Sequence, residues 1–128
     1  MPAYLNESDG YLIEACAGVT DDLSAEETAR KEAEEELGYR LNNLKQVFEA
    51  FMSPGSVTER ISCFIASYSP ADRVSDGGGA ADEGEDIEVL ELPLRQALDM
   101  VESGEIVDAK TIMLLQHASI SDAAGVGA

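Results

Sequence analysis

The stretch "ARKEAEEELGY", Ala29–Tyr39, decides the fold of this chain, because it joins a helical period of small and apolar residues to a run of glutamates. Upstream, Ser24 followed three residues later by Glu27 has the pattern of a capping box, which starts helices. Downstream, Gly38 is the kind of residue that ends them. The sequence therefore predicts a helix that begins after Ser24 and ends at about Leu37.

Three carboxylates lie on one edge of this predicted helix. At about 100° per residue, Glu32, Glu35 and Glu36 share one sector beside the apolar face. Glu32 and Glu36 are also like charges four residues apart, which repel each other unless a cation neutralises them. Two ion pairs with the same spacing are expected nearby, Lys31–Glu35 and Arg30–Glu34. The spacing alone allows two interpretations, a charged solvent face or a set of hard oxygen ligands for Mg²⁺ or Mn²⁺.

Composition limits the classes of function that are open to this chain. Its 128 residues are enough for one domain, and its net charge of −18 argues against a nucleic-acid or anionic membrane partner. No apolar run approaches the ~20 residues that span a bilayer, and no secretory signal is visible, so a cytoplasmic location is expected. Cys16 and Cys63 lie in strand-like runs, which indicates two buried, reduced thiols.

The rest of the chain alternates strand-like and helix-like periods. Two β-prone runs separated by a short turn, residues 44–53 and 59–69, predict neighbouring antiparallel strands. Further strands are predicted at residues 11–17 and 87–94, helices at 94–106 and 108–119, and a long acidic loop at 70–86. A loop of that length in a small domain is usually functional or disordered. The run Gly77–Gly79 is expected to let this loop swing.

The string from Gly18 through "KEAEEELGY" resembles the Nudix box, G-x5-E-x7-R-E-U-x-E-E-x-G-U, where U is a bulky aliphatic residue. Further motifs follow in the order seen in the branch that hydrolyses ADP-ribose and GDP-mannose, with the GDP-mannose hydrolases the nearer likeness. They are "LIEACAG", "MSPGSVTER", "ADEGEDIEVLELP" and "GEIVDAKTIMLL". The resemblance covers residues 6 to 117. It implies an α/β fold, a Nudix-like α/β/α sandwich with a mixed sheet, over residues 1–121, followed by a flexible tail at 122–128.

The resemblance also implies a reaction and the residues that carry it out. Enzymes of this branch use Mg²⁺, or Mn²⁺, to hydrolyse a nucleoside diphosphate linked to a sugar, giving a nucleoside monophosphate and a sugar phosphate. The implied metal ligands are the Ala17 carbonyl, Glu32, Glu35 and Glu36. The implied catalytic carboxylates are Glu83, Glu85 and Glu35, with the choice of base between Glu83 and Glu85 open. The implied substrate-binding residues are Glu14, Glu59 and Arg60.

Three departures from the family pattern set further expectations. The first glutamate of the box is replaced by the Leu23–Ser24 region, and Lys31 stands where the box has arginine, which loses a bidentate fork. Only 17 residues precede Gly18, so the first strands of the sheet are expected to be missing. A homodimer is expected to cover the exposed edges. The alternative function is a catalytically inactive binding or assembly module; a calcium-binding protein is disfavoured because no D-x-D-x-D-G loop is present.

Overall fold

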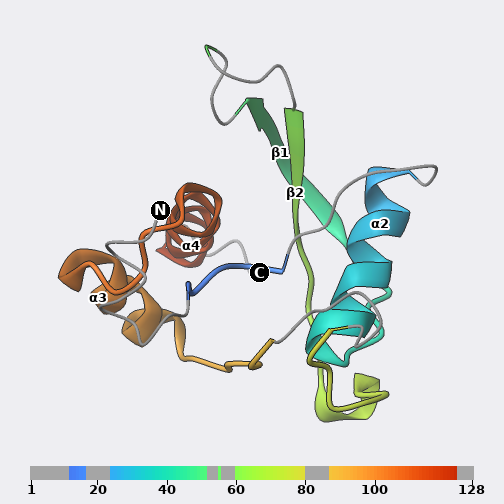
Figure 1. The fold of residues 1–128 in the computed structure, drawn as a ribbon. Coiled ribbons are helices and arrows are strands. Elements are labelled where there is room, and N and C mark those ends of the chain that lie inside the picture. Colours follow the sequence, from blue (N-terminus) through green and yellow to red (C-terminus); the bar gives the residue numbers. More distant parts are fainter. Residues whose placement is uncertain (1–11, 17–23, 52–54, 56–59, 80–86, 124–128) are drawn as a thin grey trace. The chain divides into compact units, whose positions relative to one another are not determined.

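The computed structural model describes residues 12–16, 24–51, 55, 60–79 and 87–123. The chain divides into two compact units, one made of Met1–Ala15 with Leu92–Ala128 and the other of Cys16–Glu91. The second unit holds the glutamate-rich helix and a β-hairpin, and the first holds two helices and an extended segment (Figure 1).

The glutamate-rich helix forms where the sequence predicts it. Helix α2, Ala25–Glu32, starts at Ser24, whose Oγ accepts a hydrogen bond from the Glu27 N–H at 3.2 Å. It continues directly into one π-helical turn, η1, at Ala33–Leu37, and ends at Gly38 with φ of 82°. The Gly38 N–H is shared between the carbonyls of Ala33 and Glu34, at 3.1 and 3.2 Å. The helix is confirmed, whereas its π-helical last turn was not foreseen.

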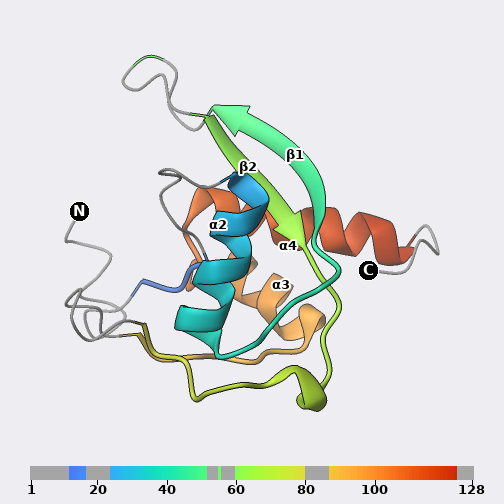
Figure 2. The same cartoon turned by 90° about the vertical axis from the view of Figure 1, so that its right-hand side faces the viewer.

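A β-hairpin accompanies this helix (Figure 2). Strands β1, Lys45–Phe51, and β2, Arg60–Ile65, pair antiparallel, with an irregularity in register between Gln46 and Phe48. This pairing confirms the prediction of two neighbouring antiparallel strands. Helix α2 contacts β2. The Cys63 thiol on β2 is buried, as expected, whereas Cys16 is only half-buried.

Two predicted strands are absent from the described residues. Residues 12–16 and 87–93 are extended but form no β-ladder there. A β-prone run becomes a strand only when a neighbouring backbone supplies its hydrogen bonds, and these two runs meet other partners. The Ala15 N–H donates to the Thr111 Oγ1 at 2.6 Å, and the Ile87 N–H donates to the Gly78 carbonyl at 3.3 Å. The described fold therefore mixes helix and strand, as an α/β fold does, around one two-stranded antiparallel sheet.

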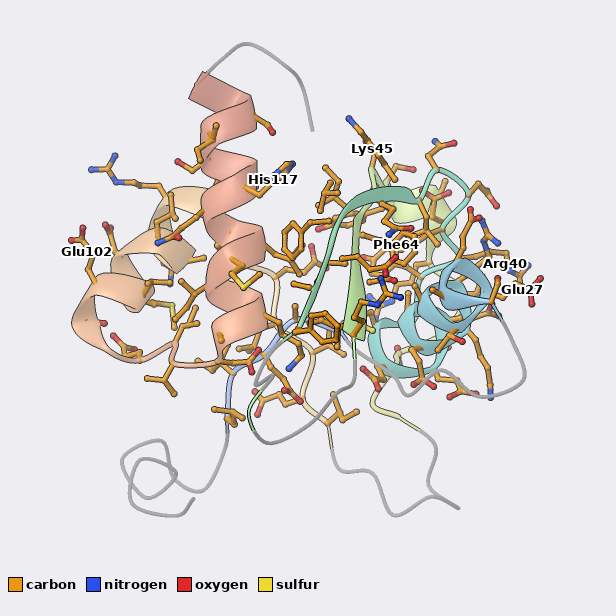
Figure 3. All side chains as sticks on the ribbon, turned by 90° about the horizontal axis from the view of Figure 1, so that it is seen from above. Glu27, Arg40, Lys45, Phe64, Glu102 and His117 are labelled. Atoms are coloured by element: carbon orange, nitrogen blue, oxygen red, sulfur yellow. The ribbon has the colours of Figure 1, made fainter. Side chains whose placement is uncertain are left out.

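The first unit contains the two C-terminal helices. Helix α3, Leu94–Ser103, ends at Gly104 with φ of 84°, and α4, Ala109–Ala123, packs against it. Both helices were predicted. Figure 3 shows Glu102 of α3 and His117 of α4 within this unit. No helix in the described ranges is long and apolar enough to cross a membrane.

Few side chains are deeply buried in the part of the chain that the structure describes. The buried hydrophobic residues are Ala33, Cys63, Ala97 and Ile106. Larger ones remain at the surface: Phe51 is 50% exposed and Ile120 is 70% exposed. Full burial of a large apolar side chain stabilises a fold by roughly 1.5–3 kcal/mol. The exposed side chains therefore add little of this free energy to the described fold.

Candidate active site

The carboxylate of Glu35 gives the strongest indication of a cation site on the glutamate-rich helix. It lies in the π-helical turn, and its Oε2 is buried without a hydrogen-bond partner in the described part of the chain. A carboxylate oxygen that is removed from water and given no donor is costly, so such atoms are usually paired with a cation or neutralised. Glu35 therefore offers a hard oxygen of the kind that Mg²⁺ or Mn²⁺ prefers.

Glu36 lies next to Glu35 and meets the segment that precedes the box. The Cys16 thiol donates a hydrogen bond to the Glu36 Oε1 at 3.2 Å. Cys16 directly precedes Ala17, whose carbonyl is an expected metal ligand. The hydrogen bond therefore places the neighbour of one expected ligand beside another, Glu36. Ala17 itself lies outside the described residues. A pairing of Cys16 with this glutamate was not visible in the sequence, because the two are 20 positions apart.

The arginine ion pairs of the same helix involve other partners than the predicted ones. Arg30 binds Glu26 at 3.1 Å and donates from its Nε to the Leu41 carbonyl at 3.0 Å. Glu34 instead accepts from Arg40 at 2.9 Å, and this hydrogen bond raises the pKa of the Arg40 guanidinium. The predicted Arg30–Glu34 pair is therefore wrong. Arg40 and the Leu41 carbonyl both come after Gly38, so a helical projection does not include them, whereas the Arg30–Glu26 pair has the ordinary four-residue spacing.

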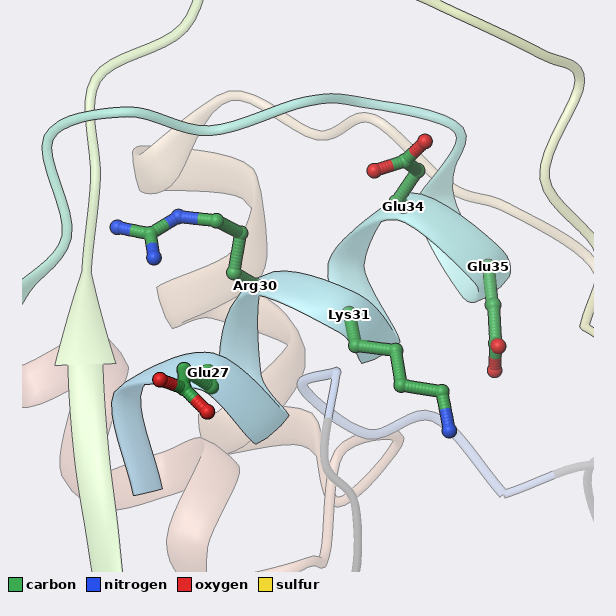
Figure 4. A pocket seen from close by; sticks show the side chains of 5 residues that line it. All are labelled: Glu27, Arg30, Lys31, Glu34 and Glu35. Atoms are coloured by element: carbon green, nitrogen blue, oxygen red, sulfur yellow. The ribbon is translucent and has the colours of Figure 1, made fainter. Parts of the chain in front are cut away.

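An open pocket of about 480 Å³ borders this helix (Figure 4). The residues that line it are Glu27, Arg30, Lys31, Glu34 and Glu35. Lys31, which replaces the arginine of the box, and Glu35 extend to the same side of the helix. The pocket thus presents an ammonium group and a carboxylate side by side, which suits a ligand that carries both phosphates and a bound cation.

The described carboxylates do not form a complete set of metal ligands by themselves. Among the residues that the structure describes, no group of three or more His, Cys, Asp and Glu side chains is arranged to hold a metal ion. Glu32, Glu35 and Glu36 nevertheless follow one another along one short helix and its last turn. Mg²⁺ usually takes one or two protein carboxylates and keeps several waters, so a partial oxygen set that includes the unsatisfied Glu35 Oε2 fits it.

The acidic loop reaches this helix through its glycines. The Gly78 N–H donates to the Glu36 carbonyl at 2.9 Å, and the Gly79 N–H donates to the Glu35 carbonyl at 3.0 Å. These two hydrogen bonds join the loop to the end of the helix, and the swing of the loop at Gly77–Gly79 stays a prediction. The predicted catalytic residues Glu83 and Glu85 lie outside the described residues.

Two of the predicted substrate-binding residues, Glu14 and Arg60, form ion pairs within their own units. Glu14 pairs with Lys110 at 2.9 Å, within the first unit. Arg60, on β2, pairs with Glu49 at 3.2 Å and lies 5.8 Å from the centroid of the Phe51 ring. Glu59 lies outside the described residues. Substrate contact by these three residues stays a prediction.

A tyrosine pair that the sequence did not reveal holds Glu91. The hydroxyls of Tyr39 and Tyr68 donate to its two carboxylate oxygens at 3.2 and 3.0 Å, and the two rings meet edge-to-face at 4.8 Å. Desolvation and the hydrogen bond to Glu91 raise the pKa of the Tyr39 hydroxyl, and the hydrogen bond and desolvation raise that of Tyr68. This arrangement attaches residue 91 to the segment that follows Gly38.

A second polar network that the sequence did not reveal starts helix α4. Asp108 accepts from the Thr111 N–H at 3.2 Å and from the Thr111 hydroxyl at 2.6 Å, and Lys110 binds both Asp108 and Glu14. Burial opposes ionisation of Asp108, but the hydrogen bonds from Thr111 and Lys110 outweigh it and lower the pKa of the carboxyl. Burial likewise opposes the charge on Lys110, while its two carboxylate partners raise its pKa.

These two shifts predict how stability depends on pH. A carboxyl whose pKa is lowered from 3.8 stabilises the fold above pH 3.8, and this contribution is lost as pH falls through its folded-state pKa. A lysine whose pKa is raised from 10.5 stabilises the fold below pH 10.5, and this contribution is lost as pH rises through its folded-state pKa. Asp108→Ala is expected to lower the free energy of unfolding by about 1–2 kcal/mol at neutral pH, because cap and ion pair are lost together.

Asp108→Asn separates the two effects, since asparagine caps helices as well as aspartate does. It is expected to cost less than Asp108→Ala and to flatten the acid limb of the stability curve, measured by urea unfolding between pH 3 and 8. The matched control is Asp99→Asn, which removes an exposed pair with Arg95 at 3.6 Å and is expected to change stability by less than about 0.5 kcal/mol. Equal losses in all three variants would contradict the assignment.

Comparison with known proteins finds relatives of one name. The chain is 54% identical over 121 residues, 94% of its length, to the GDP-mannose pyrophosphatase of Pectobacterium atrosepticum. It is 55% identical over 112 residues, 88% of its length, to the protein of that name in Cronobacter sakazakii. The corresponding protein of Escherichia coli O1:K1 is 53% identical over 116 residues, 91% of the chain.

These relatives are named for the hydrolysis of GDP-mannose, the branch of Nudix hydrolases that the motifs of this chain resemble. The comparison confirms the resemblance drawn from the box and the motifs around it. The aligned part makes up 62%, 58% and 59% of these three relatives, so the chain spans about three fifths of their length. No family model matches the chain. An alignment over 121 of the 128 residues necessarily includes the Nudix box and the helix that carries Glu32, Glu35 and Glu36.

Proposed function

We propose that this chain hydrolyses the diphosphate of a nucleotide sugar, GDP-mannose in the first place, to a nucleoside monophosphate and a sugar phosphate. The observation that carries this proposal is the identity of 53–55% to proteins named GDP-mannose pyrophosphatase over about nine tenths of the chain. The unsatisfied Glu35 Oε2 beside an open, charged pocket supports it from the structure.

The proposed cofactor is Mg²⁺, or Mn²⁺, held by Glu32, Glu35, Glu36 and the carbonyl of Ala17. The bound ion would neutralise negative charge on the diphosphate. The carboxylates of the helix would hold the ion, and the hydrogen bond from the Cys16 thiol to Oε1 restrains the side chain of Glu36. Lys31 lines the same pocket as Glu35 and contributes a positive charge for a phosphate oxygen.

The proposed catalytic groups are Glu83 or Glu85, which would take a proton from the attacking water, together with Glu35. Glu14, Glu59 and Arg60 are proposed as contacts to the substrate. For Glu14, binding a substrate group requires exchange of its ion pair with Lys110. For Arg60, it requires release from Glu49. Arg60 and Glu49 are both exposed, so exchange of that pair costs little. The Lys110 side chain is only 21% exposed, so exchange of the Glu14 pair costs more.

A Nudix α/β/α sandwich and a homodimer are also proposed. The support lies in the surface that the described chain leaves open: the hairpin of β1 and β2 is paired on one side only, and large hydrophobic residues such as Phe51 remain exposed. A second copy could cover such an edge and bury apolar surface at about 25 cal/mol per Å². Light scattering at 0.15 M salt distinguishes a dimer from a monomer.

The substrate is tested with a panel of GDP-mannose, ADP-ribose and related nucleotide sugars, each with Mg²⁺ and with EDTA. We expect turnover with Mg²⁺, with GDP-mannose giving the highest kcat/KM, and loss of turnover with EDTA. A higher kcat/KM for ADP-ribose would overturn the choice of substrate but not the reaction. Metal-dependent binding of these compounds without turnover would favour the alternative function, an inactive binding or assembly module.

A further inference from the structure

Glycines of the acidic loop pack against the main chain of the helix that carries the proposed metal ligands. The glycine segment, Gly77–Gly79, has three consecutive positive φ angles, 72°, 98° and 88°. A side chain is strained in this region of conformational space, so the segment can follow its path only because it is glycine. All three residues are at least partly buried.

The glycine segment donates hydrogen bonds to carbonyls at the end of the helix that lack donors within the helix. A helix leaves its last carbonyls without intrahelical donors. Here the N–H of Gly78 donates to the Glu36 carbonyl at 2.9 Å and that of Gly79 donates to the Glu35 carbonyl at 3.0 Å. The Gly38 carbonyl accepts from Val74 at 2.8 Å. The hydrogen bonds at the helix end are thus completed from the loop.

This contact is too close for a side chain. A Cβ on Gly77 would lie 2.5 Å from the Glu36 carbonyl oxygen and 2.7 Å from the Leu37 carbonyl carbon. Both atoms belong to the backbone of the turn, so neither can move away as a flexible side chain would. At Gly78, by contrast, a Cβ would have its nearest neighbour 3.6 Å away, at the Ile87 carbonyl oxygen.

The turn that the glycine segment holds is the one that carries Glu35 and Glu36. It is π-helical, and π-helical turns are rare and occur frequently at functional sites. Because the carbonyls of Glu35 and Glu36 are fixed from outside the helix, the directions in which their side chains leave the backbone are fixed as well. The loop and the proposed metal ligands are therefore coupled through the main chain, without any side chain of the loop taking part.

We propose that Gly77–Gly79 is a positioning element for the metal site: its N–H groups fix the π-helical turn so that the carboxylates of Glu35 and Glu36 are oriented for a divalent cation. This inference rests on the proposed function, because it takes Glu35 and Glu36 as ligands. Residues that orient metal ligands without touching the metal typically contribute 10–100-fold to metal affinity.

The test is Mg²⁺ binding to the whole chain, measured by isothermal titration calorimetry, together with amide hydrogen exchange by NMR. We expect the Gly78 and Gly79 amides to exchange slowly in the wild type. Gly77→Ala is expected to release both amides and to weaken Mg²⁺ binding by at least about 10-fold. Gly78→Ala brings backbone strain without the close contact, so a smaller loss of affinity is expected, and it replaces Gly77→Ala if that variant does not fold.

The matched control is Gly104→Ala, in the first unit, where φ is 84° and a Cβ would meet no atom within 4 Å. It introduces the same kind of backbone strain at a residue outside the turn of Glu35 and Glu36, and it is expected to leave the Mg²⁺ affinity within about twofold of the wild type. If the folded glycine variants bind Mg²⁺ as tightly as the wild type, the positioning role is wrong and the proposed function stands. If the wild type itself binds no Mg²⁺, the proposed function and this inference both fail.

Discussion

Replacing Glu35 or Glu36 by glutamine is expected to lower kcat/KM for GDP-mannose by at least about 100-fold, which corresponds to about 2.7 kcal/mol of transition-state stabilisation. Glutamine keeps the shape of glutamate and removes its charge, so the fold should be retained while the attraction for a divalent cation is lost. The buried Glu35 Oε2, which has no hydrogen-bond donor among the described residues, should be the more sensitive of the two positions.

Glu27→Gln is the matched control for this experiment. Glu27 lines the same pocket and is exposed in the first turn of α2 (Figure 3), so it loses the same charge without being a proposed ligand. Its kcat/KM is expected to stay within about threefold of the wild type, because an exposed charge that does not hold the cation is screened by solvent. An equal loss in all three variants would mean that the total charge of the pocket matters and that Glu35 and Glu36 have no special role.

Gly38→Ala is expected to be the most destabilising single substitution considered for this chain, lowering the free energy of unfolding by about 3 kcal/mol or more. Two costs add together. The φ of 82° disfavours any residue with a Cβ, which costs roughly 1–2 kcal/mol. The Cβ would also lie 2.3 Å from the Ser75 carbonyl oxygen and 2.8 Å from the Gly77 nitrogen, so the helix end and the loop would have to separate.

Urea unfolding of Gly38→Ala and Gly104→Ala separates these two costs. Gly104 has nearly the same φ and open space around its Cβ, so its replacement should cost only the backbone term, about 1–2 kcal/mol. Gly55→Ala, at an exposed glycine with no atom within 4 Å of the added Cβ, should change stability by less than about 1 kcal/mol. Equal losses for Gly38→Ala and Gly104→Ala would show that the close contact with Ser75 is absent in solution.

The elements that were predicted correctly are those whose signals are local. Ser24 and Gly38 set the bounds of the glutamate-rich helix, because a cap and a left-handed glycine act on their own neighbours. The hairpin follows from two β-prone runs separated by a short turn. The bounds of α3 follow from the apolar spacing before Gly104.

The features that were missed depend on partners distant in the sequence. Residues 87–93 have the period of a strand, yet no neighbouring strand pairs with them in the described part of the chain. The contact of Cys16 with Glu36 and that of Glu14 with Lys110 join positions 20 and 96 residues apart. A helical projection cannot find such pairs, because it contains only the helix itself.

The candidate site was predicted from the sequence only in outline. A projection at about 100° per residue placed Glu32, Glu35 and Glu36 on one edge, but the last two lie in a π-helical turn, which turns less per residue. Nothing in the residue types reveals that turn, since it is completed by hydrogen bonds from Gly78 and Gly79. The run of three glycines could have indicated a close backbone approach, which is one of the two uses of glycine, as readily as a hinge.

The products of GDP-mannose hydrolysis test the central proposal most directly. The whole chain is incubated with GDP-mannose and Mg²⁺, and the reaction is followed by ³¹P NMR. Cleavage within the diphosphate, as proposed, would give GMP and mannose 1-phosphate in equal amounts, with both signals absent for Glu36→Gln. Release of GDP and free mannose, or an unchanged spectrum from a sample that binds Mg²⁺ and is fully folded, would contradict it.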